Sequence, residues 1–239
     1  MVVIKDGDCK ILELPDFEKA FDYENNFYLS CHKNRISKIL TQYELFKKTI
    51  DLPGSIVEFG VFKGSSLIRL VMFRDLLTNS HSRKIIAFDT FDRYPNNLHE
   101  RDKGHVRDFI NKAGATSLSV DQLTKVLENG NLNENIELIQ GDISVTVPKY
   151  ISENEYEESG DSDCLKVSLI NLDTNFYQPS KVALQYFWPR LVRGGILMLD
   201  DYGIVPGETQ AVDEYFKDKD VKIQKLPLSM TPFFIIKES

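Results

Sequence analysis

The chain has 239 residues, 42% of them hydrophobic, which suits a single α/β domain spanning residues 1–239 with a sizeable core. Its net charge of −7 at pH 7 leaves no basic excess for binding nucleic acid or an acidic membrane surface. We therefore expect a partner that is neither a nucleic acid nor a membrane.

The cysteines and the N-terminus favour a cytoplasmic protein. Cys9, Cys31 and Cys164 are odd in number and too far apart for a disulfide framework or a zinc site, so free thiols are expected. No apolar run approaches the roughly 20 residues that cross a bilayer. The first residues are also charged too early for a signal peptide.

Residues 1–52 are predicted to form an N-terminal helical extension. Apolar residues recur at helical spacing between positions 35 and 50, and Leu52-Pro53-Gly54 ends the pattern. The residues on this apolar face are Ile36, Ile39, Leu40, Tyr43, Phe46 and Ile50.

After residue 54, short apolar runs alternate with helical segments, a pattern typical of a parallel sheet covered on both faces. The runs are Ser55–Phe59, Lys84–Phe88, Ile136–Gln140, Val167–Leu172 and Ile196–Leu199. The helices between them are predicted at residues 65–77, 119–129, 143–151 and 178–188.

The C-terminal part continues this pattern with a helix at residues 208–217 and two strand-like runs, 221–225 and 233–237. Their link is so short that the two strands must be antiparallel. Five parallel strands followed by such a hairpin resemble the class I methyltransferase variant of the Rossmann-like fold, with a mostly parallel seven-stranded sheet.

Residues 90–118 fit this scheme poorly, because they are long, polar and without clear periodicity. A connection of that length in a compact domain is often functional, so a lid over the site is favoured over a plain surface excursion.

The first strand leads into a glycine loop, Glu58 to Ser66. Gly60 and Gly64 allow a tight turn and close approach of the backbone to a ligand. The Gly-x-x-x-Gly spacing is neither the dinucleotide fingerprint nor a P-loop, which suits a cofactor without phosphates to bind. Glu58 is a candidate to accept a hydrogen bond from a cofactor ammonium or to act by its charge. Ser65 and Ser66 complete this candidate cofactor site.

Acidic residues also end the second and third strands. Asp89 stands where a carboxylate commonly binds ribose hydroxyls, although it could also cap a turn. Asp142 could accept from an adenine amino group or cap the helix that follows it. Three acidic strand ends in a row, at Glu58, Asp89 and Asp142, favour a cofactor site over three separate caps.

The fourth and fifth strands end at Asp173 and at the pair Asp200-Asp201. Carboxyl ends of parallel strands meet at one sheet edge, so three carboxylates converge there. Their repulsion is most simply offset by a divalent cation, and an all-oxygen set favours Mg²⁺ over zinc. Simple capping by Asp200 or Asp201 is the alternative.

A metal ion would have a use at this edge. Methyl transfer needs a hydroxyl to attack a sulfonium methyl group in line, and a bound cation favours the alkoxide-like form and orients it. Asp173 lies on a different strand from the pair, so it is the candidate metal ligand and general base together.

These residues resemble the macrocin and mycinamicin sugar O-methyltransferases (the TylF/MycF type) over about residues 30–216. The matching stretches are Glu58 to Ser66, Phe88 to Phe91, Gly141-Asp142, Leu172 to Ser180, Tyr186 to Leu191, Gly194-Gly195 and Asp200 to Gly203. The stretches from Leu172 onward are specific, whereas the glycine loop alone is not.

The resemblance implies a homodimeric, S-adenosylmethionine- and Mg²⁺-dependent enzyme that methylates a sugar hydroxyl. It implies Asp173, Asp200 and Asp201 as metal ligands, with Asp173 as the base, and Asp89 and Asp142 as ribose and adenine contacts. Asn175 departs from the family, in which an acidic residue is common there, and this leaves the acceptor open. Nucleotide-linked, polysaccharide and antibiotic sugars are all compatible, as is a small non-sugar acceptor.

Two other classes of function are disfavoured. A nicotinamide oxidoreductase on the same type of sheet conflicts with the glycine spacing and with the terminal hairpin. A non-catalytic binding partner would have no reason to keep three mutually repelling carboxylates together.

Overall fold

The computed structural model describes residues 13–94, 102–154 and 165–238. Its sheet has seven strands in the order β3-β2-β1-β4-β5-β7-β6. Strands β1 to β5 pair in parallel, whereas β7 is antiparallel to β5 and β6. The strands are β1 Ser55–Phe59, β2 Ile85–Asp89, β3 Ile136–Gln140, β4 Val167–Leu172, β5 Leu191–Leu199, β6 Gln224–Lys225 and β7 Phe233–Ile236. The predicted mostly parallel α/β fold with its C-terminal antiparallel hairpin is confirmed.

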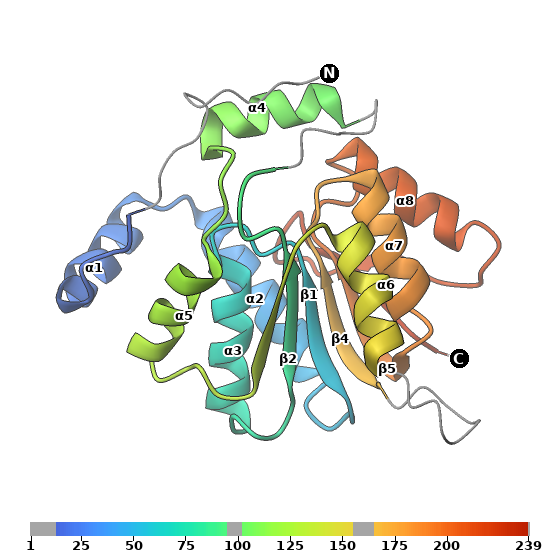
Figure 1. Cartoon of the computed structure of the whole chain (residues 1–239), viewed down its shortest axis with the longest axis horizontal. Coiled ribbons are helices and arrows are strands. Elements are labelled where there is room, and N and C mark those ends of the chain that lie inside the picture. Colours follow the sequence, from blue (N-terminus) through green and yellow to red (C-terminus); the bar gives the residue numbers. More distant parts are fainter. Residues whose placement is uncertain (1–12, 95–101, 155–164, 239) are drawn as a thin grey trace.

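Helices cover both faces of the sheet (Figure 1). Strand residues alternate between two cores, so that Ile56 contacts one helical layer while Val57 and Phe59 contact the other. The first layer contains α2 Lys33–Lys47, α3 Ser65–Leu77 and α5 Val120–Asn129, and the second contains α6 Ile143–Asn154, α7 Tyr177–Phe187 and α8 Pro206–Phe216.

The strand order reverses direction between β1 and β4. Chain segments leaving these two strands turn to opposite sides, which opens a crevice beyond their carboxyl ends. The segments that start there are the glycine loop after β1 and the loop that begins with Asp173 after β4. The topology alone therefore places the predicted residues beside one another.

Three expectations about the elements need correction. The run at residues 221–225 is a strand only over β6 Gln224–Lys225. Strand β5 begins at Leu191 and not at Ile196, because Gly194 and Gly195 interrupted the apolar run that marks a strand. Residues 90–118 contain a regular helix, α4 Lys103–Ala113, where no periodicity was expected. Its short apolar stripe at 106, 109, 110 and 113 was obscured by the polar residues on both sides.

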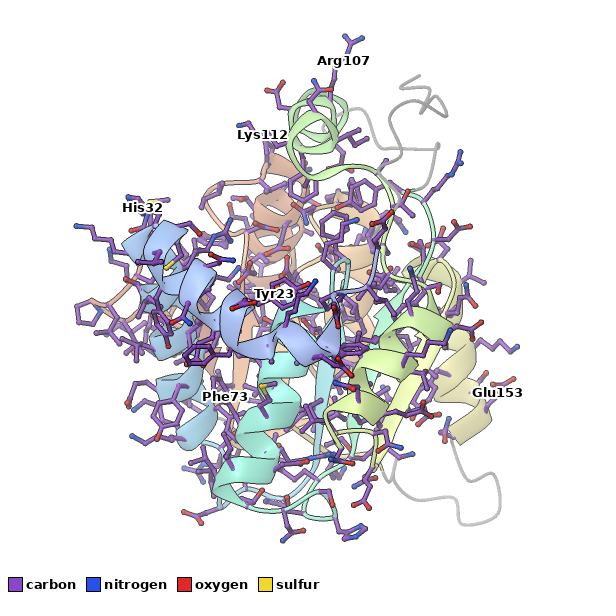
Figure 2. The ribbon with its side chains drawn as sticks, turned by 90° about the vertical axis from the view of Figure 1, so that its left-hand side faces the viewer. Tyr23, His32, Phe73, Arg107, Lys112 and Glu153 are labelled. Atoms are coloured by element: carbon purple, nitrogen blue, oxygen red, sulfur yellow. The ribbon has the colours of Figure 1, made fainter. Side chains whose placement is uncertain are left out.

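Helix α4 lies across the carboxyl end of the sheet (Figure 1). Ile110 of this helix is buried, whereas Arg107 is exposed and points away from the sheet (Figure 2). Residues 95–101 of the same segment lie outside the described part of the chain.

Besides α2, the N-terminal extension contains helix α1 Ala20–Ser30. None of the residues of α1 is buried, and the helix lies outside both layers (Figure 1). Cys31 follows it as a free thiol, and the other two cysteines lie outside the described residues. None of the helices in the described ranges has both the length and the apolarity to cross a bilayer.

Candidate active site

A cavity of about 480 Å³ opens at the carboxyl end of the sheet, within the usual size range of small-molecule sites. It brings together eight of the ten residues predicted from the sequence: Gly60, Ser65, Ser66, Asp89, Asp142, Asp173, Asp200 and Asp201. The other two, Glu58 and Gly64, do not line it.

The glycine loop runs directly against the start of the β4 loop. Gly60 has φ +89°, and a Cβ atom there would lie 2.0 Å from the carbonyl oxygen of Asp173. The amide of Asp173 in turn donates to Phe59 O at 2.9 Å. Any larger residue at position 60 would push the two loops apart. Gly64, with φ +77°, instead forms the turn into α3.

Asp89 fixes the shape of the glycine loop. Its Oδ2 accepts hydrogen bonds from the amides of Val61 at 2.7 Å and Phe62 at 3.0 Å. Its Oδ1 accepts from the amide of Phe91 at 2.7 Å. Asp89 also lines the cavity, so the carboxylate predicted to bind ribose organises the loop above it as well.

Asp142 caps a helix and also lines the cavity. Its side chain is exposed at the cavity wall, and its Oδ1 accepts from the amide of Ser144 at 2.8 Å at the start of α6. The helix cap is therefore present, and the adenine contact stays a prediction.

Glu58 is fully buried behind the loop. Its Oε1 accepts hydrogen bonds from the Ser66 hydroxyl and from Asn171 Nδ2, the latter at 3.0 Å. Burial raises the pKa of Glu58 to about 7, against the opposing effect of these hydrogen bonds. Glu58 thus supports Ser66, which does line the cavity, and the predicted direct cofactor contact of Glu58 stays untested.

The three aspartates form one acidic cluster, as the strand ends predicted. Asp173, Asp200 and Asp201 each present an oxygen within 4.8 Å of the other two. Glu208, a buried residue of α8 that the sequence did not single out, accepts from the amide of Asp201 at 3.0 Å. A fourth carboxylate therefore lies directly behind the cluster.

Burial and repulsion by neighbouring carboxylates disfavour the ionised forms of Asp173, Asp201 and Glu208. The pKa of Asp173 is raised well above its usual range, first by burial and then by Asp200 and Asp201. The same causes raise the pKa of Asp201 to about 7, and burial followed by Asp201 raises the pKa of Glu208. Lys38 opposes these shifts at Asp173 and Asp201 without cancelling them, and a divalent cation among the carboxylates would favour their ionised forms further.

The residues present fit a divalent metal ion. Buried oxygens of the cluster, Asp200 Oδ1 and Asp201 Oδ2, accept no hydrogen bond from the described residues. Buried carboxylate oxygens without partners are costly, and coordination of a cation would satisfy them. The described donor set consists of oxygens, which suits Mg²⁺.

Two basic residues of α2 reach the same cavity. Lys38 Nζ lies 2.5 Å from Asp200 Oδ2, and Arg35 lines the wall beside it. Burial alone would lower the pKa of Lys38, but attraction to Asp200 and Asp173 outweighs it and raises that pKa. The N-terminal extension is therefore part of the site.

An aromatic wall closes the side under α4. Phe62 stacks on Tyr94 with ring centroids 5.7 Å apart, and Phe109 lies 5.4 Å from Phe62. Burial raises the pKa of Tyr94, and so do Asp89 and Asp173, so Tyr94 stays a neutral phenol. This wall supplies an apolar surface opposite the carboxylates.

Sequence reasoning found the strand-end residues and missed those from elsewhere, namely Arg35, Lys38, Tyr94, Phe109 and Glu208. The first four come from the N-terminal helix and the 90–118 segment, whose positions over the sheet no pattern fixes. Glu208 did carry a signal, since it is an acidic residue in the first turn of the helix after β5.

Comparisons with known proteins identify the family of the chain. The macrocin-O-methyltransferase (TylF) family model matches residues 31–231. A Streptomyces olivaceus 8-demethyl-8-(2,3-dimethoxy-alpha-L-rhamnosyl)-tetracenomycin-C 4'-O-methyltransferase is 26% identical over 160 residues, covering 64% of this chain and 54% of the relative. A Streptomyces niveus demethyldecarbamoylnovobiocin O-methyltransferase is 23% identical over 175 residues, covering 72% and 61%. The chain thus matches less than two thirds of the length of either relative.

Solved structures share the fold. The calicheamicin methyltransferase CalS11 superposes with a TM-score of 0.71 at 23% identity, covering 90% of this chain and 84% of that chain. The O-methyltransferase NovP gives a TM-score of 0.70 at 18% identity, covering 85% and 81%. With the family model spanning most of its length, the chain belongs to the macrocin-O-methyltransferase (TylF) family.

Proposed function

We propose that this protein is an S-adenosylmethionine- and Mg²⁺-dependent O-methyltransferase acting on a hydroxyl of a sugar or sugar-containing small molecule. The observation that carries the proposal is that one cavity is lined both by a glycine loop without the spacing of a phosphate-binding motif and by a cluster of three aspartates. The loop suits a cofactor without phosphates, and the cluster suits activation of a hydroxyl group.

The cofactor would lie over the ends of β1 to β3. Gly60 allows close approach, Ser65 and Ser66 present hydroxyls at the start of α3, and Asp89 and Asp142 flank the nucleoside end of the cavity. Asp89 has both oxygens engaged by loop amides, but each carboxylate oxygen can accept more than one hydrogen bond, so it can also bind a ribose hydroxyl.

Asp173, Asp200 and Asp201 would hold the metal ion, which supplies Lewis-acid stabilisation of the acceptor oxygen when it is bound. Asp173 takes the proton of the acceptor hydroxyl as that oxygen attacks the methyl carbon. The new bond is C–O, and the bond that breaks is between the methyl carbon and the cofactor sulfur. S-adenosylhomocysteine leaves with the sulfur electron pair.

The acceptor is proposed to be sugar-like. The names of the two relatives describe O-methylation of a rhamnosyl-tetracenomycin and of demethyldecarbamoylnovobiocin. The aromatic wall of Phe62, Tyr94 and Phe109 offers a surface against which the apolar face of a sugar ring can pack.

Three further proposals accompany this function. Residues 90–118 act as a lid, supported by α4 lying over the cavity with Phe109 in its wall. The protein is a homodimer, as its family resemblance implies, and light scattering should give twice the 27.5 kDa chain mass. We also expect it in the cytoplasm.

Calorimetry tests the proposed function. S-adenosylhomocysteine should bind with micromolar affinity, and NAD should show no heat of binding. The reverse result would replace the methyltransferase by an oxidoreductase. If chelation by EDTA leaves turnover unchanged, the metal-dependent part of the proposal is wrong while the cofactor part stands.

A further inference from the structure

Lys38 places a positive charge inside the acidic cluster. It comes from α2, 162 residues before Asp200 in the chain, and its Nζ lies 2.5 Å from Asp200 Oδ2. The side chain of Lys38 is 25% exposed and that of Asp200 is 5% exposed, so water screens this pair weakly.

The ion pair engages one oxygen of the cluster and leaves other carboxylate oxygens without a partner in the described part of the chain. Lys38 occupies Oδ2 of Asp200, whereas Oδ1 of Asp200 and Oδ2 of Asp201 remain buried without hydrogen-bond partners among the described residues. Between the described residues, the pair with Asp200 is the one ion pair that reaches the three aspartates. One ammonium against three carboxylates offsets only part of the negative charge.

The direction of the electrostatic effect follows from these positions. Attraction to Asp200 and Asp173 stabilises the clustered carboxylates when no metal is bound. A divalent cation held by the same carboxylates would lie a few ångströms from the Lys38 ammonium and be repelled by it. Lysine and metal therefore compete for the same negative charge.

We infer that Lys38 is a counter-cation built into the metal site, which holds the acidic cluster together without metal and lowers its affinity for a divalent ion. This inference rests on the metal-binding part of the proposed function. It explains how four carboxylates can be assembled at this edge in a folded protein before a metal arrives. It also makes metal loading reversible and dependent on the metal concentration.

The test is direct metal binding to the full chain. Mn²⁺ is titrated into metal-free protein at pH 8.5, and free Mn²⁺ is followed by electron paramagnetic resonance. Lys38→Met keeps most of the side-chain length and removes the charge, so its Kd for Mn²⁺ should fall about tenfold or more. Lys38→Arg keeps the charge and should bind Mn²⁺ within about threefold of the wild type.

Lys47→Met is the matched control, because Lys47 lies on the same helix and pairs with Glu44 at 3.2 Å outside the cavity. Its Kd for Mn²⁺ should equal that of the wild type. Circular dichroism and S-adenosylhomocysteine binding establish that each variant is folded.

Thermal unfolding gives a second readout. Lys38→Met should melt below the wild type without metal, and Mn²⁺ should raise its Tm by more than it raises the wild-type Tm. Equal Kd values for the wild type and Lys38→Met would overturn the inference and leave the metal site intact. Weaker binding by Lys38→Met would mean that the lysine orients Asp200 for the metal. Absence of Mn²⁺ binding by both proteins would overturn the metal site and the inference together.

Discussion

Asp173 occupies the position where the two halves of the site meet. Its backbone amide and carbonyl lie against Phe59 and Gly60, and its side chain belongs to the acidic cluster. A residue held at the junction of the glycine loop and the cluster is well placed to receive a proton from a hydroxyl bound between them.

Asp173→Asn should therefore lower kcat by about 10²- to 10⁴-fold, the usual contribution of a general base. S-adenosylhomocysteine affinity should change little, because the amide keeps the shape of the carboxyl group and the loop contacts are made by the backbone of residue 173. Steady-state kinetics and calorimetry on the same preparation measure the two effects. Retention of more than half the wild-type kcat would remove Asp173 as the base.

Glu58 is expected to make stability depend on pH. Burial raises its pKa to about 7 in the folded protein, above the value of 4.5 expected when unfolded. The folded state therefore holds the proton more tightly, and the resulting stabilisation is full below pH 4.5 and is lost as pH rises through 7. Glu58→Gln removes this dependence.

The free energy of unfolding of Glu58→Gln minus that of the wild type should increase by up to roughly 3 kcal/mol between pH 5 and pH 8. Urea unfolding of both proteins at three pH values measures the difference. Glu44→Gln, on the surface of α2, should show no such trend. A difference between Glu58→Gln and wild type that stays flat with pH would contradict the proposed burial of the charge.

At the scale of elements, the strands and the helices that alternate with them were predictable, whereas helix α4 was not. The runs Ser55–Phe59, Ile136–Gln140 and Val167–Leu172 are strands with the predicted bounds, because short, largely apolar runs that alternate with helical segments are typical of a sheet covered by helices. Helix α4 was missed because its apolar stripe is short and the residues on both sides of it are polar, which leaves the segment polar overall.

Asp102, at the start of α4, contacts the N-terminal ends of α7 and α8. Asp102 is buried, and its Oδ2 accepts from the amide of Tyr177, at the start of α7, at 3.3 Å. A Cβ at Gly207, in the first turn of α8, would lie 1.8 Å from Asp102 Oδ1. The absence of a side chain at Gly207 therefore allows Asp102, at the start of α4, to lie against α7 and α8.

Gly207→Ala should displace Asp102 and loosen α4, with a loss of about 1–3 kcal/mol in stability from overpacking. Proteolysis within residues 90–118 should become faster, and KM for the acceptor should rise. Gly104→Ala is the control, because a Cβ there meets no atom within 4 Å and alanine favours the helix. Equal cleavage rates for the two variants would show that the contact does not hold the segment.

At the scale of the whole molecule, some residues of the site could be predicted from the sequence and others could not. The edge where parallel strands end is fixed by topology, so the sequence alone predicts that Asp173, Asp200 and Asp201 form a cluster. Lys38 and Tyr94 reach that edge from segments whose positions depend on tertiary packing. The local sequence pattern therefore does not predict that Lys38 lies beside Asp200 or that Tyr94 lies near Asp173.

Because the glycine loop and the sheet belong to the same domain, binding of the proposed cofactor at this loop should stabilise the entire domain. S-adenosylhomocysteine at about 100 times its Kd should add about 2.7 kcal/mol to the unfolding free energy, which for a chain of 239 residues corresponds to a Tm increase of roughly 5–10 °C. NAD at the same concentration should leave Tm unchanged, since the Gly-x-x-x-Gly loop lacks the spacing for a pyrophosphate. Differential scanning fluorimetry measures both ligands side by side. A Tm increase with NAD and none with S-adenosylhomocysteine would mean that the loop over β1 binds a different cofactor, and the methyltransferase assignment would fall with it.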